Sequence, residues 1–150
     1  MPKIKLKKQD NYEFEYKTTL QVTDINYGGH LGNDALVGIT HEARVNLLRT
    51  LGFSELDLGD GKTGIIMADL AVNYLGEGFM FDEITVYSHI DEISSVSYRI
   101  FHHIASNEKT IALAETGIIA FDYNERRIVE IPISFISALN DFCSKEGKSE

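Results

Sequence analysis

Polar residues that could do chemistry gather in a short glycine-rich stretch, directly before an apolar-patterned segment. An acid, an amide and an imidazole lie close together there, as Asp24, Asn26 and His30. Gly28 and Gly29, between them, allow positive φ or a close approach of the backbone to a ligand. The unpaired N–H groups at the start of a following helix would point at the same place. The stretch therefore predicts a site for a carbonyl oxygen, an oxyanion or a phosphate.

A long helix is the element that must position these groups. We predict it from Asp34 to Leu51, with Asn33 and Asp34 supplying an N-cap worth about 1 kcal/mol and Gly52 ending it. A face this broadly apolar indicates a helix wrapped by a sheet rather than one lying on a surface. The residues of that face are Leu36, Val37, Ile39, Ala43, Val45, Leu47, Leu48 and Leu51.

Closely spaced extended segments surround this helix. Without intervening helices they must pair antiparallel, because parallel crossovers need a dozen or more residues. One domain over residues 1–150 is predicted, of class α+β, with one helix held against a curled antiparallel sheet. The predicted strands are 12–22, 63–75, 83–92, 95–106 and 110–123, and a closing helix is predicted at 133–142.

The glycine-rich stretch resembles the signature of hotdog-fold acyl-CoA thioesterases of the 4-hydroxybenzoyl-CoA thioesterase-like group. That family's loop reads D-x-D-x-x-G-H-x-N-N, and a helix containing E-A-R follows. Asp24, Gly29, His30 and Asn33 match the loop, and 42–44 (Glu-Ala-Arg) matches the helix.

The resemblance extends past the loop, over roughly residues 12–135. Tyr74 and the run Asp82–Val86 are similar to the family's hydrophobic-Tyr and G-D-E-hydrophobic-T-V passage. It implies a hotdog fold, hydrolysis of an acyl-CoA thioester, and a homodimer or homotetramer. It also implies that loop 24–33 of one subunit faces helix 34–51 of another. The open edges of an antiparallel sheet agree, because they need pairing or cover.

One departure from the family's loop bears on catalysis. The second acid of D-x-D, a nucleophile or general base in part of the family, is Asn26 here. An amide fills neither role, because it has no lone pair basic enough at neutral pH and is a poor nucleophile. Other members of the superfamily use a helix acid, so the resemblance points to Glu42 as the carboxylate that activates water. Asn26 and His30 would then bind or polarise the substrate.

The rest of the predicted site supports these groups. We expect Asp24 to organise the loop and to orient His30, which completes a catalytic set of Glu42, His30, Asn26 and Asp24. Backbone N–H groups near Gly29 and His30 would polarise the thioester carbonyl. Substrate-binding roles fall to Gly28, Gly29, Asn33, Asp34 and Tyr74.

Two other functions stay open. With Asn26 in place of an acid, the protein could bind an acyl-CoA or acyl-carrier thioester without cleaving it. The residues Asp24 to His30 also resemble the D-x-N-P-hydrophobic-H motif of hydratase hotdogs, although the histidine follows one position later and the proline is missing. Hydration of an enoyl-CoA would distinguish that class.

Charge and composition exclude several partners. A net charge of −9 argues against nucleic acid and anionic membranes. Cys143 is the only cysteine, and no signal peptide or long apolar run occurs, so a cytoplasmic location is expected. Lys62, Lys109, Arg126 and Arg127 could meet the phosphates of CoA at a strand end, but solvated surface charge is the more usual explanation of such residues.

No metal or separate cofactor is expected, coenzyme A being part of the substrate. His41 and Glu42 begin an H-E-x-x-H motif, but Val45 stands where the second histidine is required. His102 and His103 are neighbours in a predicted strand, so they should face opposite sides of the sheet. A metal site is therefore not predicted.

Overall fold

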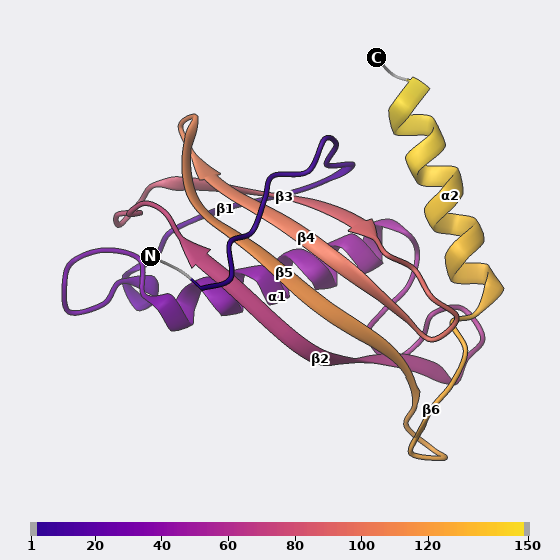
Figure 1. Cartoon of the computed structure of the whole chain (residues 1–150). Coiled ribbons are helices and arrows are strands. Elements are labelled where there is room, and N and C mark those ends of the chain that lie inside the picture. The colour runs from indigo at the N-terminus through magenta and orange to yellow at the C-terminus, as the bar shows by residue number, and fades with distance from the viewer. Residues whose placement is uncertain (1–2, 149–150) are drawn as a thin grey trace.

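A strongly curled antiparallel sheet lies over one long helix in the computed structural model, which describes residues 3–148 (Figure 1). Over that range the chain forms six strands and two α-helices, with one short 3-10 helix. They are β1 (Phe14–Thr19), the 3-10 helix (Val22–Asp24), α1 (Asn33–Thr50), β2 (Thr63–Tyr74), β3 (Glu83–Asp91), β4 (Ser97–Ser106), β5 (Lys109–Asp122), β6 (Arg127–Ile128) and α2 (Ile133–Lys148).

The strand order confirms the predicted α+β class with a curled antiparallel sheet. The strands follow the order β1-β3-β4-β5-β2, with β6 attached to β5, and every pair is antiparallel. Most predicted strands are confirmed to within a residue or two. The first is shorter than predicted, because the chain leaves the sheet after Leu20 and turns into the 3-10 helix. The two-residue β6 was not predicted.

α1 buries one side against the inner face of the sheet. Leu36, Ile39, Ala43 and Leu47 are buried as the pattern predicts. Val45 is exposed instead, because the buried side includes Thr40, Arg44 and Leu48 at four-residue spacing. The burial of a charged residue, Arg44, is therefore the main departure from the predicted face.

Glycines define both ends of α1. The N-cap is Gly32 rather than Asn33 or Asp34, and a Cβ added at position 32 would lie 2.8 Å from Asp34 Oδ1. At the other end, Gly52 has φ +89° and its N–H donates to the carbonyl of Arg49. With the N–H of Phe53 donating to Leu48, this is a Schellman motif, which confirms Gly52 as the helix stop.

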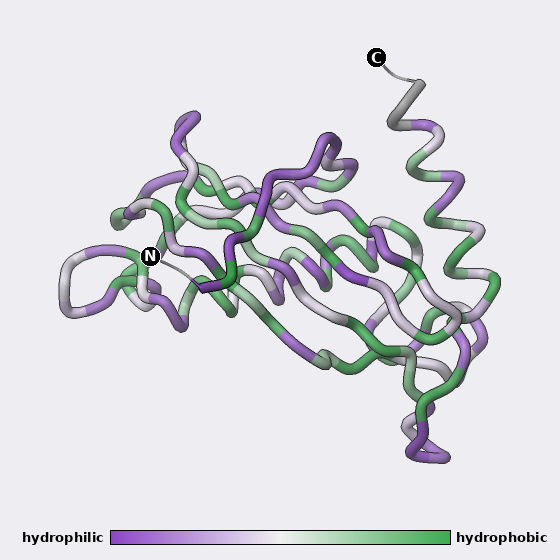
Figure 2. The backbone as a smooth tube through the Cα atoms, in the orientation of Figure 1, coloured by the Kyte–Doolittle hydropathy of each residue, from purple (hydrophilic) through white to green (hydrophobic). Residues whose placement is uncertain are grey.

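The apolar core has two parts along α1. One part surrounds the N-terminal half of the helix with residues of β1, β3, β4 and β5. The other surrounds its C-terminal half and includes Phe135 and Leu139 of α2. Figure 2 shows the turn between β4 and β5 and the turn after β5 as hydrophilic, and neither turn contributes a residue to these two clusters.

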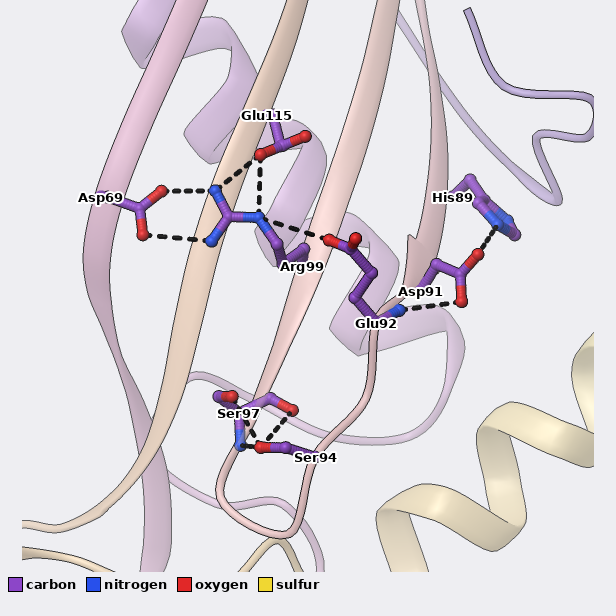
Figure 3. Close-up of polar contacts among 8 residues, drawn as sticks. All are labelled: Asp69, His89, Asp91, Glu92, Ser94, Ser97, Arg99 and Glu115. Atoms are coloured by element: carbon purple, nitrogen blue, oxygen red, sulfur yellow. Dashed lines mark hydrogen bonds and ion pairs between the residues drawn. The ribbon is translucent and has the colours of Figure 1, made fainter. Parts of the chain in front are cut away.

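The outer face of the sheet carries an ion network that joins three strands (Figure 3). Arg99 on β4 donates from Nη1 to Asp69 on β2 at 3.1 Å and from Nε to Glu115 on β5 at 2.8 Å. To reach β2, the guanidinium passes over Gly117 of β5, where an added Cβ would lie 2.6 Å from Nη1. Hydrogen bonds from Arg99 hold the pKa of Asp69 below its usual value. The network therefore requires glycine at position 117, because a side chain there would occupy the space of the guanidinium.

We predict that Gly117→Ala lowers the free energy of unfolding by about 1–3 kcal/mol, because the methyl group displaces Arg99 and Asp69. Gly38→Ala is the matched control. Gly38 lies on the exposed side of α1 with open space around its would-be Cβ, so this change should stabilise by about 0.5–1 kcal/mol. Urea unfolding measures both. Equal effects of the two substitutions would contradict the role given to Gly117.

Candidate functional site

The glycine-rich stretch forms a small closed hairpin directly before α1. Ile25 and Leu31 form an antiparallel bridge, and within it the N–H of Asn26 donates to the carbonyl of His30 at 2.9 Å. The N–H of Gly29 donates back to the carbonyl of Asn26 at 3.1 Å, and its φ of +79° explains the glycine. The loop is therefore ordered by its own backbone.

The side chain of Asn26 completes this hairpin. Its Oδ1 accepts from the N–H of Gly28 at 2.9 Å and from that of His30 at 3.4 Å. The amides of Gly28, Gly29 and His30 thus all donate inside the loop. This differs from the expectation that N–H groups near Gly29 and His30 would polarise a substrate carbonyl. Asn26 Nδ2, by contrast, has no hydrogen-bond acceptor among residues 3–148.

Asp24 organises the loop, as predicted, but does not orient His30. Its carboxylate accepts from the N–H of Gln21 at 2.8 Å, and its carbonyl accepts from Gly32 at 2.9 Å. His30 is half-buried, with Nδ1 3.2 Å from the carbonyl of Leu31. If the hydrogen-bonding proton lies on Nδ1, Nε2 carries the lone pair. The backbone, not a carboxylate, holds this imidazole.

The first turn of α1 supplies the hydrogen-bond donors that the loop does not. Asn33 Oδ1 accepts from the N–H of Asp34 at 3.0 Å, and the Tyr74 hydroxyl donates to the carbonyl of Asn33 at 2.9 Å. Burial and the Asp34 charge raise the pKa of Tyr74, which keeps its phenol a donor. The N–H groups of Asn33 and Ala35 have no acceptor in the described part of the chain. They are the unpaired donors at this helix end.

Glu42 lies further along α1, on its exposed side. In the single chain the apolar residues of the helix therefore do not enclose its carboxylate. The hydroxyl of Tyr16 on β1 donates to Glu42 Oε2 at 2.8 Å, and burial together with this carboxylate raises the pKa of Tyr16. Sequence reasoning missed Tyr16, although its alternation with Phe14 along β1 places it on the inner face.

One chain does not bring Glu42 to the loop. Glu42 follows Asn33 by nine residues, and at ~1.5 Å per residue the helix separates them by about 13 Å along its axis. The loop residues and Asn33, Asp34 and Tyr74 do come together at the start of α1. Glu42 and the loop therefore lie at separate places along the helix of one chain.

Arg44, the arginine of the Glu-Ala-Arg motif, is buried between α1 and the sheet, although the motif does not predict its burial. Arg44 Nε donates to Glu55 at 3.0 Å, and His41 Nε2 lies 2.7 Å from the same carboxylate. Burial alone would raise the pKa of Glu55, but these two partners hold it below its usual value. These two contacts of Glu55 hold the loop after α1 against the helix.

His102 is the most deeply buried titratable group of that layer. It faces α1 while His103 faces outward, which confirms the prediction of opposite sides. Nδ1 of His102 lies 2.7 Å from the Ser88 hydroxyl, and its Nε2 has no partner among residues 3–148. Burial lowers the pKa of His102 to about 3. Two other buried hydroxyls, of Tyr98 and Thr116, also have no partner in the described chain.

Two cavities lie outside the glycine loop. One of about 130 Å³ lies between α1, β1 and β3, beside Tyr16, Ala43 and Ser88. Another of about 560 Å³, lined by Lys62 and Arg127 among others, lies at the end of the sheet away from the glycine loop. Lys62 and Arg127 thus lie together, whereas Lys109 begins β5 at its opposite end, so the four cations do not form one group.

Comparison with known proteins supports the fold of this site. Residues 20–139 match the model of the thioesterase-like superfamily. No curated protein matches the chain in sequence. Among residues 3–148, no helix is both long and apolar enough to cross a membrane.

Solved structures resemble the chain over most of its length. A 1,4-dihydroxy-2-naphthoyl-CoA thioesterase from Synechocystis is 18% identical, with a TM-score of 0.77 over 85% of this chain and 96% of that one. A gentisyl-coenzyme A thioesterase is 20% identical, with a TM-score of 0.74 over 83% and 98%. A protein from Staphylococcus aureus in complex with CoA is 16% identical, with a TM-score of 0.79 over 87% and 84%. These likenesses confirm the predicted hotdog fold.

The buried neutral His102 predicts a pH-dependent stability. Its pKa is about 3 in the folded chain and about 6.5 when unfolded. Below pH 6.5 only the unfolded state takes up the proton, so stability falls as pH falls. Between pH 7 and pH 5 the loss from this residue should be about 2 kcal/mol. Urea unfolding at both pH values should show a smaller loss for His102→Gln. An equal loss of stability in the natural protein and in His102→Gln would contradict the role given to His102.

Proposed function

Because the chain belongs to the thioesterase-like superfamily, we propose that it hydrolyses the thioester bond of an acyl-CoA. One observation carries the proposal. A loop that satisfies its own hydrogen bonds presents Nε2 of His30 and Nδ2 of Asn26 beside a helix start whose Asn33 and Ala35 N–H groups have no acceptor among residues 3–148. The CoA-ester names of similar thioesterases and the CoA complex of another similar structure favour this substrate class.

The proposed reaction is the addition of water to the thioester carbonyl. The carbonyl oxygen accepts hydrogen bonds from the first-turn N–H groups of α1, which stabilise the negative charge that develops there. The carboxylate of Glu42 takes a proton from the water as the new carbon–oxygen bond forms. When the carbon–sulfur bond breaks, the thiolate of CoA leaves and takes up that proton. His30 and Asn26 hold the substrate against the loop.

We propose that the two halves of this site come from two protomers of a dimer or a tetramer. The separation along α1 requires that Glu42 meet the loop of another chain. β2 offers a place for pairing, because it is an edge strand of twelve residues on which Met67 is about half exposed. Tyr16 would orient the Glu42 carboxylate from within its own chain.

A second candidate function is binding without hydrolysis. The observation that favours it is Asn26, an amide where part of the family has its catalytic acid. In the structure Oδ1 of this side chain accepts a hydrogen bond from the N–H of Gly28, and a carboxylate oxygen of aspartate would accept it equally well. The substitution Asn26→Asp therefore changes the chemistry and leaves the hairpin intact.

The Glu42→Gln variant tests the proposed base. It should lower kcat/KM for acyl-CoA hydrolysis by about 10²-fold or more, because the amide keeps the shape but accepts no proton. KM should change little. Glu130→Gln, an exposed acid far from the loop, is the matched control and should keep full activity. Steady-state assays of released thiol over a panel of acyl-CoAs measure both.

Asn26→Asp in the same assay separates the two functions. For an enzyme, the activity of this variant should equal or exceed that of the natural protein. If the natural protein is inert and the substitution makes it active, the binding function is established instead. A fully active Glu42→Gln protein would contradict the role given to Glu42.

A further inference from the structure

The N-terminal arm, residues 3–12, crosses the outer face of the sheet, on the side away from α1 (Figure 1). A buried amide on β2 holds it there. Asn73 Oδ1 accepts from the N–H of Leu6 at 2.7 Å, and Asn73 Nδ2 donates to the carbonyl of Ile4 at 2.9 Å. At its far end the N–H of Gln9 donates to the Tyr12 hydroxyl at 2.9 Å. The arm is therefore a fixed part of the outer face.

A cavity of about 380 Å³ lies between this arm and the sheet. That volume is near the lower end of the range for small-molecule sites, about 300–1,000 Å³. The arm contributes Lys8 and Tyr12, and the sheet contributes Thr85 and Tyr87 of β3, His103 and Ala105 of β4 and Thr110 of β5. The turn between β4 and β5 adds Asn107 and one acid, Glu108. It opens on the opposite face of the sheet from α1.

Three aromatic rings form one wall of the cavity. The ring of Tyr12 lies 6.4 Å from that of Tyr87 and 5.8 Å from that of His103, and the last two are 5.8 Å apart. Nε2 of His103 lies 2.9 Å from the hydroxyl of Thr110. Burial and the charge of Lys8 lower the pKa of His103, so its ring is neutral at pH 7. Neutral rings of this kind stack on planar aromatic ligands.

The arm also concentrates positive charge on an acidic protein. The whole chain has a net charge of −9, yet four lysines fall within residues 3–8. They are Lys3, Lys5, Lys7 and Lys8, all exposed. Figure 2 shows the arm as mostly hydrophilic. Residues 3–12 hold these four lysines and one acid, Asp10. A local excess of positive charge attracts an anionic ligand.

We propose that this cavity binds a nucleotide, with the base against Tyr12, Tyr87 and His103 and the phosphate beside the lysines of the arm. A nucleotide has a planar ring, which can stack on the aromatic wall, and a negative charge, which the lysines of the arm attract. The amide of Asn107 and the hydroxyls of Thr85 and Thr110 supply polar groups for the base edge and the sugar. The same chemistry belongs to a free nucleotide and to the nucleotide end of coenzyme A.

Titration of the full-length protein with AMP tests the site, by calorimetry or by NMR. The natural protein should bind saturably. Tyr87→Leu, which keeps bulk but removes the ring, should weaken binding about 10-fold or more, and Tyr87→Phe should bind within about 2-fold of the natural protein. Lys8→Gln should weaken binding and reduce its dependence on salt. Lys145→Gln, which removes an exposed lysine on α2, is the matched control and should have no effect.

Absence of saturable AMP binding, or equal affinity of the natural and Tyr87→Leu proteins, would overturn the proposal. Because AMP has no thioester, this result is independent of hydrolysis, and either proposal can fail alone.

Enzyme kinetics identify the source of the nucleotide. If Tyr87→Leu raises KM for an acyl-CoA but not for the matching acyl-pantetheine, the cavity holds the nucleotide end of coenzyme A. If neither KM changes while AMP binding is lost, the cavity holds a free nucleotide. Both results support the site.

Discussion

The length of α1 is the constraint on which the account of this protein depends. The helix is fixed at its start by the hairpin of the glycine loop and at its end by the Schellman motif at Gly52, and it packs along the sheet in between. Its rise places the backbone of Glu42 about 13 Å along the axis from that of Asn33, at the start of the helix. The proposed sharing of the site between two protomers rests on this separation.

The backbone N–H groups of the loop and those of the helix start have different roles. Backbone amides that could have faced a substrate instead hold the loop in shape, through Asn26 and the bridge between Ile25 and Leu31. What remains for a ligand is the imidazole of His30, the amide of Asn26 and the N–H groups of the first helical turn. A loop that is already ordered loses little conformational freedom when a substrate binds. The two faces of the sheet also differ: the inner face holds α1 and a buried neutral His102, while the outer face carries ion pairs and the arm.

Local patterns in the sequence predicted the elements well and the contacts between them poorly. Alternation and turn residues placed β2 to β5, and helical periodicity with Gly52 placed α1, because both signals depend on near neighbours. Arg44 and Tyr16 were beyond such reasoning: their partners, Glu55 and Glu42, lie in other elements. The same holds for Gly117, which is required only because Arg99 and Asp69 meet above it. The sequence likewise does not show that Lys109 lies at the opposite end of β5 from Arg127.

Mixing two inactive variants tests the shared site most directly. Proteins carrying His30→Ala and Glu42→Gln should each be nearly inactive as pure oligomers. Co-expressed in equal amounts, they should form mixed dimers with one doubly altered site and one intact site. Activity should then return to about a quarter of the natural level, since about half of the dimers are mixed and each of these has one intact site. If mixed dimers form and activity does not return, the loop and Glu42 do not act across two chains, and the account of the site is wrong.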